Sequence, residues 1–353
     1  MQFGDPIKAQ QPLLVINYCM DEEDRLLSHQ IQAVNRLAES FVDVYVITGK
    51  IGKYKSPPNV HVMSSQWKSG YNILNALRFL SIALRFVVSK RPISIFSHMT
   101  DVQTALLAPF TKLLGIPHYL WYAHTHPSIF LRWGKFWVTG IITSTVGSCP
   151  IKGPKVLAIG QAIDPDDYNF NKLGSSYSLN NFVHIGRFDP SKNIEQIIRS
   201  LQEFRKAHPG ISLTLIGQPS TPAATVHAAQ IIKKYEEDVK DGWLNFRDSI
   251  PRSEVSVELL KYDCFIHAYT GSLDKALVEA TMVGLPIATI NPEYLVEFGP
   301  WSKGSQVSLL EELDAINGES SENLGSELYN RRKICEEKHS IAHWSESLTD
   351  ILS

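Results

Sequence analysis

Two cations lie close together in the stretch GRFDPSKN, residues 186–193, where a strand is expected to pass into a helix. Arg187 has a forked guanidinium that suits phosphate, and Lys192 lies near the start of the expected helix. A basic residue there opposes the helix dipole unless an anion lies between them. The spacing favours a clamp for a diphosphate, and the alternative is a surface turn whose cations are solvated.

A second candidate site lies in the stretch HAYTGSLDKALVEATMVGLP, in which a strand, a loop of small residues and a helix follow one another. Backbone N–H groups of Gly271 and Ser272 can receive an anion at the start of this helix. Asp274 suits the helix N-terminus, Lys275 adds a phosphate contact, and Glu279 lies one turn from Lys275. The alternative is an ordinary helix with an i,i+4 ion pair. The two stretches together are more specific, because they occupy equivalent ends of neighbouring strand–helix units.

Histidines near expected strand ends form a third group of candidates. His124 and His126 follow the run LWYA. Their i,i+2 spacing also suggests a metal site, but no third ligand is evident in the nearby sequence. We therefore predict no metal. His29 and His98 lie near other strand-end loops and are weaker candidates. The alternative for each is a structural or solvent-facing histidine.

Short apolar runs that alternate with helical patterns would position these residues. The runs are PLLVINY, VDVYVIT, NVHVMS, ISIFSH, HYLWYA, GIITST and KVLAIG, followed by NFVHIG, ISLTLIG, WLNFRD, CFIHAY and LPIATI. Nearly continuous apolar strands suit a parallel sheet that is buried on both faces. Strand–helix alternation in two series predicts two doubly wound α/β units. A polar, turn-rich stretch at residues 164–181 separates the two series.

Composition narrows the class of protein. The 353 residues carry a formal net charge of −2, which argues against a general nucleic-acid binder. The four cysteines lack CxxC spacing and fit a reducing compartment, and the polar N-terminus lacks a signal-peptide pattern, so we expect a cytoplasmic protein. Residues 73–90 form the most apolar stretch, interrupted by Arg78 and Arg85. They predict a helix packed on a sheet, or alternatively a helix on a membrane surface.

Two common nucleotide motifs are missing from the sequence. The first strand is followed by CMDEEDRLLSH rather than by G-x-G-x-x-G, and no G-x-x-x-x-G-K-[ST] occurs. The absence of these motifs argues against a dehydrogenase and against a P-loop enzyme.

The chain resembles the retaining GT-B glycosyltransferases of glycosyltransferase family 4. GRFDPSKN matches the family's Gly-Arg and Lys-Asn pattern, and LDKALVEATMVGLPIAT resembles its Leu-Glu-Ala, then Gly-Leu-Pro-Val segment. VLAIGQAIDPDDYNF resembles the stretch that ends the family's first domain, and LTLIGQPS occupies the place of a strand that ends in glycine, here Gly217. The resemblance spans nearly the whole chain and is strongest over residues 155–290.

The resemblance implies roles for individual residues. Arg187 and Lys192, after Gly186, would bind the donor diphosphate and offset the charge on the leaving group, so that no metal is needed. Glu279 matches the second glutamate of the family's pair, which contacts the donor ribose, whereas Gly271 stands where the first would be. The remaining donor contacts would come from Ser272, Leu273, Asp274 and Lys275, and the base would lie near Arg247 and Ile250. His124 would act near the reacting sugar, with His29, His98 and His126 on the acceptor side.

The resemblance also implies the architecture and the activity. Two Rossmann-like domains would face a central cleft, with the acceptor domain at 1–165, the nucleotide-sugar domain at 166–335 and a helix at 336–353 that crosses back. We expect a retaining, metal-independent glycosyltransferase without a cofactor. A nucleotide-sugar donor and a glycan, lipid-linked or small-molecule acceptor would be its partners, with possible peripheral membrane contact and no nucleic acid. The alternatives are an epimerase or phosphorylase on this fold, and a non-catalytic nucleotide-sugar binder.

Overall fold

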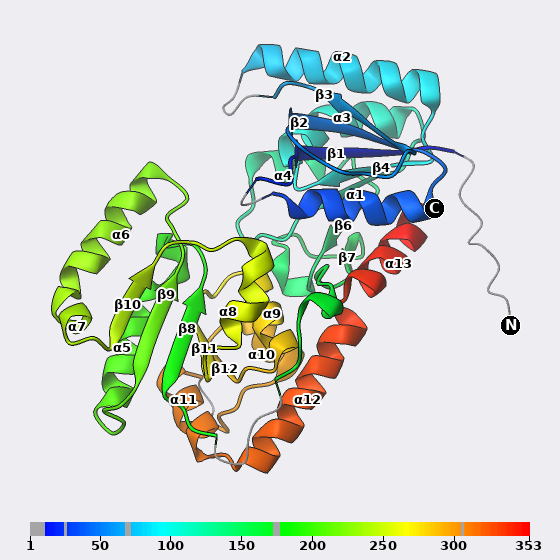
Figure 1. Cartoon of the computed structure of the whole chain (residues 1–353). Coiled ribbons are helices and arrows are strands. Elements are labelled where there is room, and N and C mark those ends of the chain that lie inside the picture. Colours follow the sequence, from blue (N-terminus) through cyan, green and yellow to red (C-terminus); the bar gives the residue numbers. More distant parts are fainter. Residues whose placement is uncertain (1–10, 25–26, 68–71, 172–176, 305–306) are drawn as a thin grey trace, which may run out of the picture. The chain divides into compact units, whose positions relative to one another are not determined.

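The computed structural model describes residues 11–24, 27–67, 72–171, 177–304 and 307–353 (Figure 1). The chain divides into two compact units, which are described one by one below. Unit 1 comprises residues up to Ala162 together with Ala342–Ser353, and unit 2 comprises Ile163–Ile341. The structure thus divides the chain after 162 and after 341, where the sequence suggested 165 and 335.

Unit 1 is built on a seven-stranded parallel sheet with the order β3-β2-β1-β4-β5-β6-β7. The strands are β1 (Leu13–Met20), β2 (Val44–Ile51), β3 (Val60–Ser64), β4 (Ser94–His98), β5 (His118–Trp121), β6 (Gly140–Thr143) and β7 (Val156–Ala158). The chain starts in the middle of the sheet and winds first to one edge and then to the other. This order is typical of a doubly wound fold, whose ligands bind beyond the carboxyl ends of the strands.

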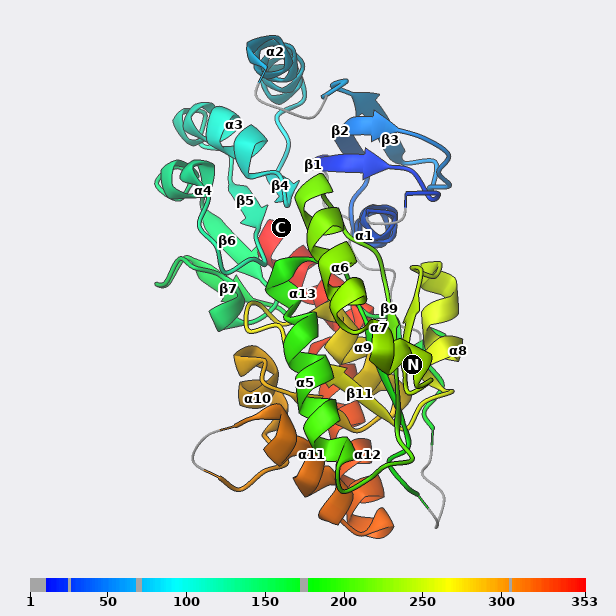
Figure 2. The same ribbon diagram turned by 90° about the vertical axis from the view of Figure 1, so that its left-hand side faces the viewer.

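Alternating residues of β1 explain why both faces of this sheet are covered by helices. Leu13 and Val15 pack in one buried cluster with residues of α1 (His29–Ser40) and α13 (Ile341–Leu352). Leu14 and Ile16 point to the opposite face and pack with residues of α2 (Ile73–Lys90) and with Leu107 of α3 (Asp101–Leu113). Figure 2 shows α2, α3 and α4 (Ile129–Gly134) in a row along this second face.

Unit 2 is built on a five-stranded parallel sheet with the order β10-β9-β8-β11-β12. The strands are β8 (Asn181–Ile185), β9 (Ser212–Ile216), β10 (Leu244–Arg247), β11 (Cys264–His267) and β12 (Ile287–Thr289). The helices are α5 (Ile194–Arg205), α6 (Pro222–Lys234), α7 (Glu236–Lys240), α8 (Val255–Leu259), α9 (Lys275–Val283), α10 (Pro292–Phe298), α11 (Leu309–Gly318) and α12 (Ser321–Lys338). The prediction of two doubly wound parallel-sheet domains is confirmed, and each strand in the described residues falls on a predicted run.

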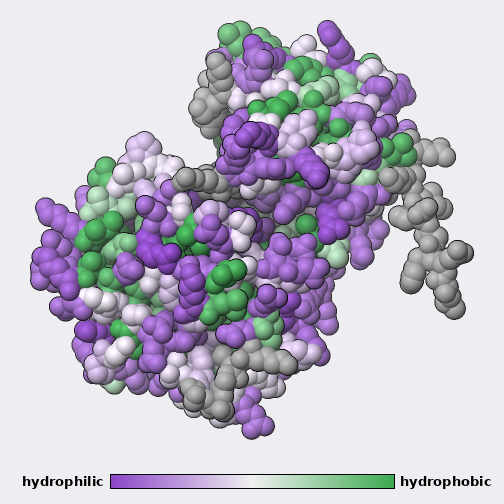
Figure 3. All heavy atoms as spheres, viewed as in Figure 1, coloured by the Kyte–Doolittle hydropathy of each residue, from purple (hydrophilic) through white to green (hydrophobic). Residues whose placement is uncertain are grey.

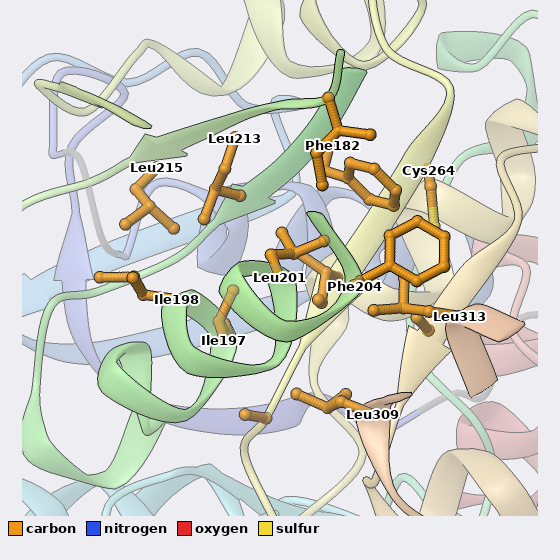
Figure 4. Close-up of a cluster of buried hydrophobic side chains, with 14 of the residues drawn as sticks. Phe182, Ile197, Ile198, Leu201, Phe204, Leu213, Leu215, Cys264, Leu309 and Leu313 are labelled. Atoms are coloured by element: carbon orange, nitrogen blue, oxygen red, sulfur yellow. The ribbon is translucent and has the colours of Figure 1, made fainter. Parts of the chain in front are cut away.

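Helix α5 shows how the apolar period of the sequence becomes a buried core. Its apolar residues recur at helical spacing and are all buried: Ile194, Ile197, Ile198, Leu201 and Phe204. They pack against Phe182 of β8 and against Leu213 and Leu215 of β9 (Figure 4). This packing fixes α5, and with it the preceding turn that carries the candidate cations, on one face of the sheet.

The helical tail of the chain is interrupted, which corrects the expectation of one last helix containing His339. Residues 339 and 340 lie outside any helix, between α12 and α13. The carbonyl of His339 accepts from Ile163 N–H (3.0 Å), and Ile341 N–H donates to the carbonyl of Ile163 (2.7 Å). This backbone pairing, an isolated parallel bridge between Ile163 and Ser340, separates α12 from α13.

The predicted helix over 73–90 is present as α2, and its buried side packs on the sheet of unit 1. No helix within the described ranges combines the length and the apolar character that a membrane span requires.

Candidate functional site

Strands β8 and β11 are neighbours in unit 2, with Phe182 beside Cys264 and Val183 beside Phe265. Because the strands are parallel and in this register, their last residues, Ile185 and His267, lie at the same edge of the sheet. The loops that follow carry GRFDPSK and AYTGSLDK, so the structure brings the two candidate stretches together.

Lys192 is buried between these two loops. It ends the short 3-10 turn Pro190–Lys192, and its side chain is 8% exposed. Its ammonium pairs with the Asp274 carboxylate and lies 4.1 Å from the centre of the Tyr269 ring. Asn193 adopts a left-handed conformation (φ 50°) and donates to the carbonyl of Ala268 (3.1 Å). The turn is therefore tied to the loop after β11, which fixes where the cation lies.

Asp274 connects Lys192 to a buried histidine. His267 Nε2 lies 3.1 Å from Asp274 Oδ2, and His267 Nδ1 lies 3.4 Å from the hydroxyl of Thr289. Burial alone would raise the pKa of Asp274, but the Lys192 charge and the His267 hydrogen bond hold it well below its usual range. Asp274 therefore stays ionised and orients the Lys192 ammonium.

Arg187 lies on the outer side of the same turn and is about half exposed, at 49%. Its guanidinium lies 3.0 Å from Asp189 Oδ2 and 3.5 Å from the Ser220 hydroxyl. Asp189 is held in turn by Ser220, whose backbone N–H and hydroxyl both donate to it. Both candidate cations thus have a carboxylate partner, Asp189 for Arg187 and Asp274 for Lys192.

Two glycines allow the ends of β8 and β9 to approach closely. Gly186 N–H donates to the Ile216 carbonyl (3.0 Å). A Cβ atom at Gly217 would lie 1.8 Å from the carbonyl oxygen of Gly186, which is a backbone atom that a side-chain rotation cannot remove. The requirement for glycine at 217 therefore comes from packing between two strand ends.

Gly271 also faces a neighbour that leaves no room for a side chain. A Cβ atom there would lie 2.1 Å from the end of the Tyr269 ring. Asn291 is buried and donates to the carbonyls of Tyr269 (2.8 Å) and Ser272 (3.1 Å). The Ser272 carbonyl and the Leu273 N–H belong to one trans peptide, in which the two groups point in opposite directions. Because the carbonyl points toward Asn291, the Leu273 N–H points away from it. Tyr269 fills the space in which the resemblance would have put the first glutamate.

We expect Gly271→Ala to destabilise the protein by about 1–2 kcal/mol, because the new methyl group displaces Tyr269 from Lys192. Tyr269→Ala removes the obstacle, so the double variant should be more stable than the sum of the two single changes predicts. The coupling should be about 1 kcal/mol in a double-mutant cycle from urea denaturation. If the changes in unfolding free energy of the two single variants add up to that of the double variant, Tyr269 does not occupy this space.

Helix α9 presents a second group of charged residues near its start. Glu279 is buried and forms an ion pair with Arg252, which comes from the loop after β10. Lys275 is partly buried, and within the described residues its ammonium makes no ion pair or hydrogen bond. Burial and the charge of Arg252 lower the pKa of Lys275 to about 7, against the opposing charges of Glu279 and Asp167. Lys275 can therefore gain or lose its charge near neutral pH.

The loop after β10 is anchored by a second ion pair. Arg247 Nη1 lies 2.5 Å from Glu258 Oε1 and 3.2 Å from the Tyr262 hydroxyl. Burial would raise the pKa of Glu258, but hydrogen bonds from Lys261, Arg247 and Tyr262 lower it to about 2. Ile250 packs against a buried cluster of unit 2. Arg247 is thus engaged within the unit, so Arg252 is the arginine of this loop that reaches the α9 group.

The four candidate histidines of unit 1 lie in two places. The rings of His98, at the end of β4, and His29, at the start of α1, meet edge to face with centres 5.8 Å apart. His124 and His126 are exposed in the loop after β5, where the Tyr122 hydroxyl donates to the His126 carbonyl (2.6 Å). Over the described ranges, no set of three His, Cys, Asp or Glu residues is arranged to hold a metal ion.

Five residues described above in the unit 2 site escaped the sequence prediction: Asp189, Arg252, His267, Tyr269 and Asn291. Tyr269 and Asp189 stand inside the quoted stretches, but their contacts depend on side-chain direction. Asn291 gives a weak signal as the residue before Pro292, where an N-cap is expected, and it does cap α10 by accepting from Tyr294 N–H. Asn291 also holds the Tyr269–Ser272 loop through hydrogen bonds, and these contacts depend on the fold rather than on a local sequence pattern.

The unit 2 site can therefore receive a group with more than one negative charge. Lys192, Arg187 and Lys275 are cations at one strand edge, and the start of α9 adds the positive end of a helix dipole. The carboxylates of Asp189 and Asp274 lie beside two of these cations and hold them at this edge.

A known family resembles this chain in sequence over part of its length, and known structures resemble nearly all of it. Residues 166–298 match the family model for the glycosyl transferases group 1. No curated protein matches the chain in sequence. In structure it resembles Anabaena HepE, solved in complex with UDP and glucose (TM-score 0.72, 13% identity, covering 96% of this chain and 98% of HepE).

Two further solved structures are similar over nearly their whole length. Sucrose-phosphate synthase from Thermosynechococcus elongatus has a TM-score of 0.76 at 12% identity, with 97% of this chain and 98% of that chain covered. The lipopolysaccharide outer core galactosyltransferase WaaB has a TM-score of 0.67 at 9% identity, with 97% and 99% covered. The chain therefore has the GT-B fold, with two Rossmann-like domains.

Proposed function

We propose that this protein is a retaining glycosyltransferase that moves a sugar from a nucleoside diphosphate sugar to an acceptor. The observation that carries the proposal is the meeting of Arg187, Lys192 and the start of α9 at one edge of the unit 2 sheet. The match of residues 166–298 to the glycosyl transferases group 1 and the GT-B fold support transfer from a nucleotide sugar.

In the proposed reaction, the bond between the anomeric carbon and the diphosphate oxygen breaks, and its electron pair leaves with the diphosphate. Lys192 and Arg187 offset the negative charge that develops there, which is the task that a metal ion performs in other phosphate sites. The acceptor oxygen forms its bond to the anomeric carbon on the same face, and its proton passes to the departing phosphate oxygen. The configuration of the sugar is thereby retained.

We place the remaining contacts of the donor at the same edge of the unit 2 sheet. We assign the ribose to Glu279, which Arg252 holds in place, and the base to the loop that contains Ile250. Asp274 is a positioning residue, because it acts through Lys192. In unit 1, His124 and His126 are exposed in one loop and remain the proposed acceptor-side residues with His29 and His98.

Lys275 should make donor affinity depend on pH near neutrality. Its ammonium forms as the pH falls through about 7, and the charged form is the one that a phosphate favours. The dissociation constant of a nucleotide sugar should fall about threefold or more from pH 8 to pH 6, measured by calorimetry. A nucleotide sugar suits this test because its diphosphate has no ionisation in this range. Lys275→Met should remove this slope, and the exposed Lys261→Met should keep it. An equal slope in Lys275→Met would assign the pH dependence to another group.

The proposed activity is tested by turnover of nucleotide sugars in the purified protein. We expect release of the nucleoside diphosphate, loss of that release in Arg187→Ala, and full activity after treatment with EDTA. Proton NMR of the product should show the anomeric configuration of the donor. An inverted product would refute the retaining mechanism, and a requirement for added metal would refute metal independence.

One observation favours a second candidate, a non-catalytic nucleotide-sugar binder: Gly271 and the Tyr269 ring occupy the place in which the resemblance would have put the first glutamate. A binder would give a thermal shift with nucleotide sugars but no release of nucleoside diphosphate from any of them, with or without acceptors.

We propose no resident cofactor, since the nucleotide sugar would be a co-substrate. All four cysteines are free and buried, which suits the reducing conditions of the cytoplasm that we propose as its location.

A further inference from the structure

The chain carries an uneven distribution of charge within unit 1. Residues 72–163 contain nine Lys and Arg residues and one acidic residue, Asp101, although the whole chain has a net charge of −2. The Asp101 carboxylate accepts a hydrogen bond from Ser128. Residues 21–24, by contrast, read Asp-Glu-Glu-Asp, so unit 1 has an acidic loop and a separate basic region.

The basic region also exposes large apolar side chains on α2. Six exposed residues form a stripe at helical spacing: Leu74, Leu77, Arg78, Ser81, Arg85 and Val88. Ile73, at the first turn, is 74% exposed. The buried side of the helix packs on the sheet through Phe79 and Phe86, so the stripe points away from the sheet. Figure 3 shows hydrophobic and hydrophilic residues side by side over α2.

The neighbouring helices extend this mixture of apolar and basic side chains. Leu113, at the end of α3, is 83% exposed, and Ile129, at the start of α4, is 73% exposed. Trp133 of α4 and Phe136 just after it are also exposed. Lys112 of α3 donates to the Phe136 carbonyl (3.0 Å) and so connects the ends of the two helices. Because α2, α3 and α4 lie in a row on one face of the sheet (Figure 2), these residues form one surface, called here the basic-apolar face.

We propose that the basic-apolar face docks unit 1 on the surface of an anionic lipid bilayer. Arginines and lysines that project from a helix face attract anionic headgroups, and Leu, Trp and Phe beside them enter the boundary between headgroups and acyl chains. Phosphate attraction alone would not favour exposed leucines, so a lipid surface fits the face better than a nucleic acid does. Docking in the interface requires no membrane-spanning helix, consistent with the helices described.

This proposal uses no residue of the unit 2 site and does not rest on the proposed function. If both hold, the enzyme works at a membrane surface, and a lipid-linked acceptor becomes the expected class. Vesicle binding is measured without a nucleotide sugar, and turnover is measured without vesicles. A failure of membrane docking is therefore distinguished from a failure of the proposed glycosyl transfer.

The test is co-sedimentation of the full chain with phosphatidylcholine vesicles that contain about one third phosphatidylglycerol, compared with pure phosphatidylcholine. We expect binding to the anionic vesicles that weakens as salt is raised. Arg78→Gln/Arg85→Gln should weaken partitioning about 25-fold, because each cation near an anionic surface contributes about fivefold. The matched control, Lys53→Gln/Lys55→Gln, makes the same charge change beside the acidic loop and should bind as the wild type does.

Two further measurements separate a bilayer from other polyanions. Leu74→Ser/Leu77→Ser should weaken vesicle binding without changing the retention of the protein on heparin. Lipids with brominated acyl chains should quench tryptophan fluorescence in the wild type and less in Trp133→Phe. Absence of binding to anionic vesicles, or equal binding by Arg78→Gln/Arg85→Gln and wild type, would overturn the proposal. Heparin or RNA binding that depends on the arginines but not on the leucines, without vesicle binding, would assign the face to a polyanion instead.

Discussion

Lys192→Ala should reduce the kcat of sugar transfer about 100- to 1000-fold, because it removes a fixed positive charge from the proposed leaving group. The expected size follows from the burial of the lysine, since a charge at a site with little water acts more strongly than one in solvent. The rate of nucleoside diphosphate release at saturating donor is the measurement. Lys206→Ala, an exposed lysine of the same unit in an ion pair with Glu203, is the matched control and should keep full activity.

Loss of Lys192 also leaves the Asp274 carboxylate without its main partner, so the variant is expected to be less stable by about 3 kcal/mol. Lys192→Ala/Asp274→Asn removes that stranded charge and should recover much of the stability while remaining inactive. Activity in the double variant near that of the wild type would contradict a role for Lys192 in the reaction.

Gly217→Ala should have the largest effect on folding. Its methyl group would meet the Gly186 carbonyl oxygen at 1.8 Å, so the ends of β8 and β9 must separate. We expect the free energy of unfolding to fall by about 4 kcal/mol or more in urea denaturation, with loss of nucleotide binding.

Gly210→Ala is the matched control for this change, because a Cβ atom at 210 meets nothing within 4 Å. Its free energy of unfolding should stay within about 0.5 kcal/mol of the wild-type value. A wild-type stability for Gly217→Ala would show that the two strand ends are farther apart than described.

The fold was predictable because each strand and helix repeats one simple pattern several times. The apolar run of β1 predicts burial on both faces, and Leu13 and Leu14 do face opposite clusters. The apolar period of α5 predicts its buried side in the same way. Such signals extend over many residues, so that one unusual residue does not cancel them.

The partners of the candidate cations could not be predicted, because they depend on side-chain direction and on contacts between distant loops. Lys192 meets Asp274 from another strand end, and Arg187 meets Asp189, two residues away in its own turn. The break at His339 was also invisible, since it is caused by backbone pairing with Ile163, far away in the sequence.

Gly271 shows where a family resemblance reaches its limit. The resemblance identified a missing carboxylate, but it gave no physical reason for a glycine at that position. The structure supplies one, because Tyr269 occupies the space and covers Lys192. The consequence for sugar recognition is part of the proposed function and depends on Tyr269 as much as on Gly271.

A thermal-shift panel of nucleoside diphosphates and nucleotide sugars tests the central claim most directly, namely that the strand edge of unit 2 binds a nucleoside diphosphate. A ligand at a hundredfold excess over its dissociation constant stabilises the protein by about 2.7 kcal/mol. We predict a clear increase in Tm with at least one ligand, loss of the increase in Arg187→Ala, and its retention in Arg199→Ala, an exposed arginine of α5. No shift with any common base or sugar, or an unchanged shift in Arg187→Ala, would contradict the claim.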